Sequence, residues 1–193
     1  NGEFLYRVND NFIKLCSDKD FINGRVNRST ELDGLVPTLN FTGDNLYSYE
    51  WKNGKTLYNC DLNILKEFLN FCSANMWIPY GSEIDCTKFY KDKTMSRLEL
   101  FLSNRSHFYK GHHTVNGLET DSIGELIDDF DWSSILSGVP TKVFHGDLQF
   151  DNVIYGDDKK FYLLDWRQNF NGGIIGDVYY DLAKMYGGIL MSY

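Results

Sequence analysis

The sequence lacks long apolar runs and has no excess of positive charge. No apolar run approaches 18 residues, and the first residues do not resemble a signal peptide, so neither membrane insertion nor export is indicated. Lys and Arg together number 19 against 27 Asp and Glu, which gives a net charge of -8 at pH 7. That balance argues against a nucleic-acid surface as the main function, although it selects no partner by itself.

Cysteine is scarce and shows no pattern. The four cysteines have neither close pairing nor the spacing of a metal site: Cys16, Cys60, Cys72 and Cys86. This favours reduced thiols and a cytoplasmic protein over a disulfide framework. His107, His112 and His113 also lack the spaced helical pair that is typical of zinc enzymes. With no further ligand evident near them, we expect these histidines to lie on a surface loop.

The chain does have the composition of a folded protein. It has 193 residues, of which 42% are apolar and 16% aromatic, enough to form a core in one domain or two small lobes. Apolar residues recur at helical spacing over residues 61–76, where Asp61 is a suitable N-cap. A second helix is predicted over residues 94–109, capped by Thr94. Ser122 and Glu125 form a capping-box pattern that opens a third, shorter helix.

The most informative stretch is residues 145–152, which read His-Gly-Asp-Leu-Gln-Phe-Asp-Asn. We expect residues 142–144 to run as a strand into it. Apolar runs at 153–155 and 161–164 flank a polar turn, which predicts a β-hairpin. Because a hairpin brings its strand ends together, we expect Asp147 and Asn152 to lie beside Asp165. Such a set of carboxylate and amide oxygens is what Mg2+ prefers. Phosphoryl transfer needs an orienting carboxylate and residues that hold metal against phosphates.

Together these motifs resemble the aminoglycoside phosphotransferase and choline kinase-like family. The resemblance rests on His-Gly-Asp, an Asn five residues after that Asp, and an Asp thirteen residues after the Asn. Residues 176–183, with Asp177 and Asp181, are similar to the family's Gly-Asp...Asp-Leu-Ala helix. The resemblance implies an α+β, bilobal protein-kinase-like fold that uses Mg2+ and ATP, or another nucleoside triphosphate.

Individual roles follow from the same resemblance. Asp147 would be the catalytic base or hydroxyl-orienting residue, with Asn152 and Asp165 as the metal ligands. His145 would hold the loop through hydrogen bonds. Asp177 and Asp181 share a helical face, and we expect Asp177 to brace the catalytic loop.

Arg167 has two possible roles, and the sequence does not decide between them. Its planar guanidinium suits an anionic substrate or the transferring phosphoryl group. A structural ion pair with a nearby Asp is equally compatible with its position.

The N-terminal part predicts a strand, a tight turn and a strand over residues 2–15. Lys14, in the second strand, resembles the phosphate-contacting lysine of kinases, and Glu31 resembles the helix glutamate that pairs with it. The alternatives are a lysine exposed on an edge strand and a glutamate on a solvated helix face. No glycine-rich hairpin precedes Lys14, so we expect an incomplete small lobe.

Two further strands are predicted at residues 38–42 and 46–51. Tyr49, Glu50 and Trp51 resemble the segment that joins the two lobes and contacts adenine through its backbone. This places a small lobe at residues 1–51 and a catalytic lobe at residues 52–193, without the C-terminal helices that the family usually has. Gly54-Lys55-Thr56 is not a P-loop, because position 49 is Tyr where that motif needs Gly.

The sequence therefore predicts an ATP-dependent kinase that phosphorylates a hydroxyl of a small polar molecule, without nucleic-acid or membrane partners. Two alternatives stay open: an inactive nucleotide-binding pseudokinase that serves as a scaffold, and a kinase-like domain excised from a larger enzyme. Residues 166–168 and the pair Tyr179-Tyr180 resemble bacterial members associated with surface-sugar or capsule synthesis. Antibiotic, choline and sugar acceptors remain possible.

Overall fold

The structure, a computed structural model, describes residues 2–81, 83–106 and 111–191. The chain divides into two compact units. The first joins Asn1–Ser82 with Val139–Tyr193, and the second is Glu83–Gly138. Both predicted lobes contribute to the first unit, so the lobe boundary at residue 51 stays a prediction.

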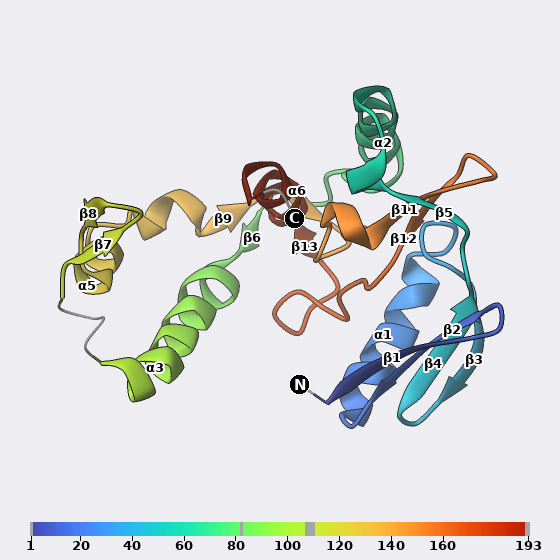
Figure 1. Ribbon diagram of the computed structural model, residues 1–193, viewed down its shortest axis with the longest axis horizontal. Helices are drawn as coiled ribbons and strands as arrows, with labels where there is room; N and C mark the ends of the chain where they lie inside the picture. The colour runs from blue at the N-terminus through green and yellow to red at the C-terminus, as the bar shows by residue number, and fades with distance from the viewer. Residues whose placement is uncertain (1, 82, 107–110, 192–193) are drawn as a thin grey trace. The chain divides into compact units, whose positions relative to one another are not determined.

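The first unit begins with a four-stranded antiparallel sheet in the order β1-β2-β4-β3 (Figure 1). Its strands are β1 (Glu3–Val8), β2 (Asn11–Cys16), β3 (Leu39–Gly43) and β4 (Leu46–Glu50). Asn9, with a φ of 53°, forms the turn between β1 and β2. These strands confirm the predicted strand–turn–strand pattern and the second strand pair. Helix α1 (Lys19–Glu31) contacts β2, β3 and β4, and Asp18 caps it by accepting the N–H of Phe21.

A second sheet has the order β12-β11-β5. The hairpin of β11 (Val153–Gly156) and β12 (Phe161–Leu163) is the one predicted from the apolar runs. Strand β5 (Gly54–Thr56) pairs with β11 and leads into the short helix η1 (Leu57–Asn59). The Gly-Lys-Thr triplet is thus part of a strand, which confirms that it is no P-loop.

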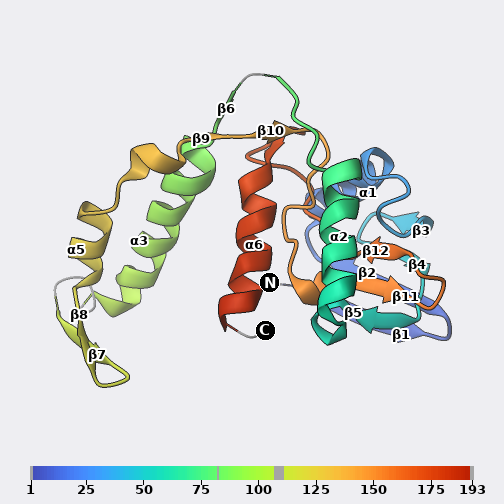
Figure 2. The same cartoon turned by 90° about the horizontal axis from the view of Figure 1, so that it is seen from above.

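Helix α2 (Leu62–Asn75) begins at the predicted cap, where Asp61 accepts the N–H groups of Asn63 and Ile64. Its apolar stripe buries Phe68 and Cys72 in the main core, together with Leu148 and Trp166 from the two ends of the central motif. Helix α6 (Val178–Met191; Figure 2) follows β13 (Gly176–Asp177), which pairs with β10 (Pro140–Thr141). The loop at residues 145–152 therefore lies on the core.

The second unit is built from small elements. Strand β6 (Ile84–Asp85) pairs with β9 (Ser137–Gly138), and the hairpin of β7 (His113–Val115) and β8 (Leu118–Thr120) precedes α5 (Ile123–Asp128). Ser122 and Glu125 form the predicted capping box. A short 3-10 helix, η3 (Trp132–Ile135), ends the unit before β9.

Two sequence predictions need correction. Helix α3 (Lys93–Arg105) is not capped by Thr94. It continues directly from a π-helix, η2 (Lys88–Asp92), so there is no free helix end at Thr94 that needs a cap. Its predicted residues 107–109 lie outside the described part of the chain. Residues 142–144, expected as a strand before His145, are irregular, since β10 ends at Thr141.

The four cysteines are free thiols, as predicted. Within the residues that the structure describes, no helix is both long and apolar enough to span a membrane.

Candidate active site

The hydrogen bonds of His145 define one form of its ring. The side chain is fully buried, Nε2 lies 2.8 Å from the carbonyl oxygen of Leu164, and Nδ1 accepts the N–H of Asp147 at 3.2 Å. A carbonyl must receive a proton and a backbone N–H must give one, so the ring is neutral with its proton on Nε2. Burial lowers the pKa of His145 to about 4, which agrees with this assignment. His145 therefore holds the loop, as predicted, by linking its start to the end of β12.

Asp181 on α6 holds the same loop from the other side. Its two carboxylate oxygens accept the N–H of His145 at 2.9 Å and the N–H of Gly146 at 2.7 Å. The indole of Trp77 lies 3.4 Å from the same carboxylate. Asp181 is fully buried, and this burial raises its pKa to about 6 against the opposing effect of the three donors.

Asp177 bonds the backbone on both sides of the start of α6. Its side chain accepts the N–H groups of Val139 and Tyr179. Asp181, one helical turn later, accepts the N–H groups of the loop at residues 145–152, and the bracing role of Asp177 stays a prediction.

Asp147 lies in the loop that His145 and Asp181 fix. Its carboxylate forms an ion pair with Lys184 of α6, at 2.9 Å between Nζ and Oδ1. Asn152 donates its side-chain N–H to the carbonyl oxygen of Asp147 at 2.8 Å, and its own carbonyl accepts the N–H of Leu164. These bonds tie the predicted base, the predicted amide ligand and the residue before Asp165 into one network. The sequence reasoning missed Lys184. The one signal available was its position, one helical turn after Asp181 on α6.

Asp165 follows this network in a strained backbone conformation, with a φ of 60°. One of its oxygens, Oδ1, pairs with both Nζ of Lys14 and Nη1 of Arg25. Burial opposes the charge of this carboxylate, but the two cations prevail and lower its pKa. Lys14 is 2% exposed and reaches a second carboxylate, Glu3 of β1, at 2.8 Å. The structure thus brings Lys14 to Asp165, and it adds Arg25 and Glu3, which the sequence reasoning missed.

The predicted pair of Lys14 with Glu31 is wrong. Glu31 instead pairs with Arg28 one turn earlier on α1. Arg28 is buried and also donates to the carbonyl oxygens of Lys142 and Phe144, which links α1 to the chain just before the catalytic loop. Glu31 is therefore engaged in holding Arg28, and the carboxylate partner of Lys14 in the small sheet is Glu3.

The predicted adenine-contacting segment consists of the last two residues of β4 and of Trp51, which follows the strand. Tyr49 is buried and stacks on Phe12, with ring centroids 4.7 Å apart. The N–H of Trp51 donates to the carbonyl of Asp10, and the side chain of Glu50 pairs with Lys52. The contact of this segment with adenine stays a prediction.

Arg167 supports the catalytic loop through its backbone. Its N–H donates to the carbonyl of His145 at 2.8 Å, and its Nε donates to the carbonyl of Asn169 at 3.0 Å. Gly146 has no room for a side chain, because a Cβ there would lie only 2.5 Å from Cβ of Arg167. The glycine also has a φ of 82°, so both its conformation and its neighbour require Gly.

Asn152 and Asp165 have the chemistry of Mg2+ ligands. Because Asn152 uses its N–H group on Asp147, its Oδ1 remains available as an acceptor. Asp165 supplies carboxylate oxygens, but Oδ1 is already paired with two cations. The oxygen set fits a hard divalent ion, provided that Lys14 and Arg25 yield that oxygen.

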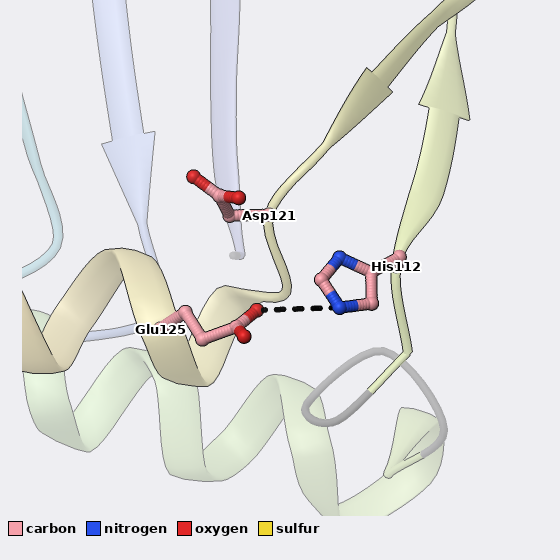
Figure 3. A group of neighbouring side chains, drawn as sticks. All are labelled: His112, Asp121 and Glu125. Atoms are coloured by element: carbon pink, nitrogen blue, oxygen red, sulfur yellow. Dashed lines mark ion pairs between the residues drawn. The ribbon is translucent and has the colours of Figure 1, made fainter.

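A separate cluster in the second unit corrects the expectation that His112 has no ligand partners nearby. His112, Asp121 and Glu125 place their ligand atoms within 4.8 Å of one another (Figure 3). All three are exposed, and Glu125 accepts the N–H of Ser122 at 2.9 Å as the capping box requires. Helix capping thus accounts for the position of Glu125, and we assign no metal to this group. His107 lies outside the described residues.

Comparison with known proteins gives structural matches alone. No protein-family profile and no curated sequence matches the chain. Among solved structures, the complex of APH(2")-IIa with gentamicin matches with a TM-score of 0.54 and 17% identity, over 93% of this chain and 65% of that one. The ternary complex of APH(2")-IIa with streptomycin and ATP matches with a TM-score of 0.50 and 15% identity, over 94% and 69%.

The chain spans about two thirds of the length of these solved structures. At such low identity the match concerns the fold, and it agrees with the family resemblance of the central motif. This chain has the kinase-like fold of the aminoglycoside phosphotransferases.

Proposed function

We propose that this protein is an ATP-dependent phosphotransferase that acts on a hydroxyl group of a small polar molecule. The observation that carries the proposal is the network joining Asp147, Asn152 and the chain before Asp165, which neutral His145 and buried Asp181 hold in place. Precise support of this kind is what a catalytic carboxylate needs. The fold that the chain shares with APH(2")-IIa agrees with the proposal, since one matched structure contains ATP.

Each residue of the network has a role in this reaction. Asp147 would orient the acceptor hydroxyl and accept its proton, while Lys184 holds the carboxylate in position. Lys14 would contact the phosphates of the nucleotide. Asn152 and Asp165 would hold Mg2+, which supplies neutralisation of the charge that develops on the phosphates.

A second candidate is a nucleotide-binding module without catalysis. It is favoured by the pairing of Asp165 with Lys14 and Arg25, because an oxygen occupied by two cations is not open to a metal. The complete set of Asp147, Asn152 and Asp165 opposes it, since a module that only binds has no use for a hydroxyl-orienting carboxylate.

ATP binding distinguishes both candidates from a protein that binds no nucleotide. Calorimetry on the wild type and on Asp165→Ala, each with and without Mg2+, should show tighter binding with metal in the wild type alone. Equal affinities in all four measurements would contradict the role of Asp165.

Turnover then separates the kinase from the binding module. ADP release should be followed with a panel of hydroxyl compounds, beginning with sugars because of the resemblance of residues 166–168 to proteins of surface-polysaccharide synthesis, and including aminoglycosides and choline. Asp147→Ala should lose transfer and retain ATP binding. An Asp147→Ala variant with wild-type turnover would exclude Asp147 as the base.

A further inference from the structure

Arg25 occupies an unexpected place for a cation. It projects from the middle of α1, and its Nη1 pairs with the same oxygen of Asp165 that Lys14 contacts. The residue is 7% exposed, whereas the side chain of Asp165 is 40% exposed. The exposed part of this cluster is therefore the carboxylate, and both cations are buried.

The backbone and the ring environment of Arg25 hold it there. Its carbonyl oxygen accepts the indole N–H of Trp166 at 2.9 Å, which fixes α1 to the residue following Asp165. The guanidinium lies over the ring of Phe21, 4.5 Å from the centroid. Although burial opposes its charge, Asp165 raises the pKa of Arg25, so the side chain is a fixed cation.

The guanidinium has more donors than the described residues use. Its Nε is buried and has no hydrogen-bond partner among them. An unpaired buried donor is costly, and a planar guanidinium is well suited to phosphate oxygens. The unpaired Nε therefore gives Arg25 a reason to bind an anionic ligand.

The charges around Asp165 show when that ligand would be needed. Lys14 and Arg25 are balanced by Glu3 and Asp165, so the cluster is neutral. If a divalent ion takes Asp165, both cations lose the counter-ion that they share. The triphosphate of a nucleotide that arrives with the ion can replace it, because its oxygens carry several negative charges.

We propose that Arg25 is a phosphate ligand of the nucleotide site. When nucleotide binds, the guanidinium releases Asp165 and pairs with the triphosphate. This inference rests on the proposed nucleotide-binding function. In the free protein, Asp165 is then neutralised by Lys14 and Arg25, and part of the affinity for ATP does not depend on metal.

The test is calorimetry of ATP binding in EDTA and in Mg2+, with adenosine as a ligand that lacks phosphate. Arg25→Met should weaken ATP binding in EDTA by about tenfold or more, the loss expected for a charge-assisted bond, and leave adenosine binding unchanged. Arg25→Lys keeps the charge but not the planar guanidinium, so its affinity for ATP in EDTA should lie between those of the wild type and Arg25→Met. Arg97→Met removes an exposed arginine of α3 and serves as the matched control.

Asp165→Asn should change ATP binding in the opposite direction, and a merely structural role of Arg25 does not predict this change. Freed of their shared carboxylate, Lys14 and Arg25 should bind ATP in EDTA about threefold or more tightly than in the wild type, and Mg2+ should add nothing. This variant also tests the inference if Arg25→Met does not fold.

The outcomes separate the two proposals. A wild type that binds ATP under neither condition would overturn both. Wild-type binding that Arg25→Met leaves unchanged, or that Asp165→Asn weakens in EDTA, would overturn the role of Arg25 and leave the proposed function standing.

Discussion

Replacing Asp181 with Asn tests the support of the catalytic loop, because the change keeps the shape of the side chain and removes its charge. The amide offers one oxygen where the carboxylate offers two, so one of the N–H groups of His145 and Gly146 loses its acceptor. A buried donor without a partner costs about 1–3 kcal/mol. The change also has a stabilising effect, because a neutral Asn avoids the free-energy cost of burying a charge.

The raised pKa of Asp181 gives the size of this second effect. The pKa rises from 3.8 to about 6, which corresponds to about 3 kcal/mol against the charged form at about 1.4 kcal/mol per pH unit. At pH 7 the two effects are of similar size and opposite sign. We therefore expect the free energy of unfolding of Asp181→Asn to stay within about 2 kcal/mol of the wild-type value at this pH, while phosphate transfer falls because the loop is held less firmly.

The pH dependence makes the prediction sharper. Between its unfolded and folded pKa values, Asp181 binds a proton in the folded state that it does not bind when unfolded, so its contribution to stability is full below pH 3.8 and is lost as the pH rises through about 6. Asn has no such titration. The stability of Asp181→Asn relative to the wild type should thus increase by roughly 1 kcal/mol from pH 5 to pH 7.5.

Urea unfolding followed by tryptophan fluorescence measures this difference at each pH. Titration of His145 acts in the opposite direction, because its lowered pKa adds stability that is lost as the pH falls from 6.5 towards 4. Taking the difference between variant and wild type cancels that contribution. Asp128→Asn, which removes an exposed carboxylate, controls for the change in net charge. A difference that does not vary with pH would refute the buried-charge interpretation of Asp181.

Three other changes have definite expected outcomes. Lys184→Met should reduce transfer with little effect on stability, because its pair with Asp147 is about one third exposed and such pairs contribute about 0–1 kcal/mol; turnover equal to the wild type would show that Asp147 needs no cation. Gly146→Ala should lower both the thermal midpoint and the turnover, since a side chain at a φ of 82° costs about 1–2 kcal/mol before the clash with Arg167, and an unchanged midpoint would contradict this. Phe68→Ala should cost about 3–5 kcal/mol in urea unfolding, because the ring is fully buried in the main core, and a loss below about 1 kcal/mol would mean that α2 packs differently.

Local patterns in the sequence were sufficient for much of the fold. The cap of α2 at Asp61, the β11–β12 hairpin and the capping box of α5 depend on residues only a few positions apart, so their chemistry is visible in the chain itself. The spacing of His145, Asp147, Asn152 and Asp165 likewise pointed to the kinase-like fold, which the structural matches confirm.

Contacts between distant segments were beyond the sequence. Arg25 and Asp165 are 140 residues apart, and Lys14 and Asp165 are 151 apart. Their meeting depends on how α1 packs against the turn that contains Trp166. The mistaken pairing of Lys14 with Glu31 has the same origin, since helix rotation decides which side chain faces the strand, and here Glu31 turns towards Arg28.

The sequence by itself determined the local elements and the order of the catalytic motif, because capping, turn formation and apolar periodicity act over a few residues. Only the tertiary structure decided which charges meet at Asp165, that Lys184 pairs with Asp147, and that Asp181 holds the loop. Those partners come from separate elements, and packing of the core fixes their positions.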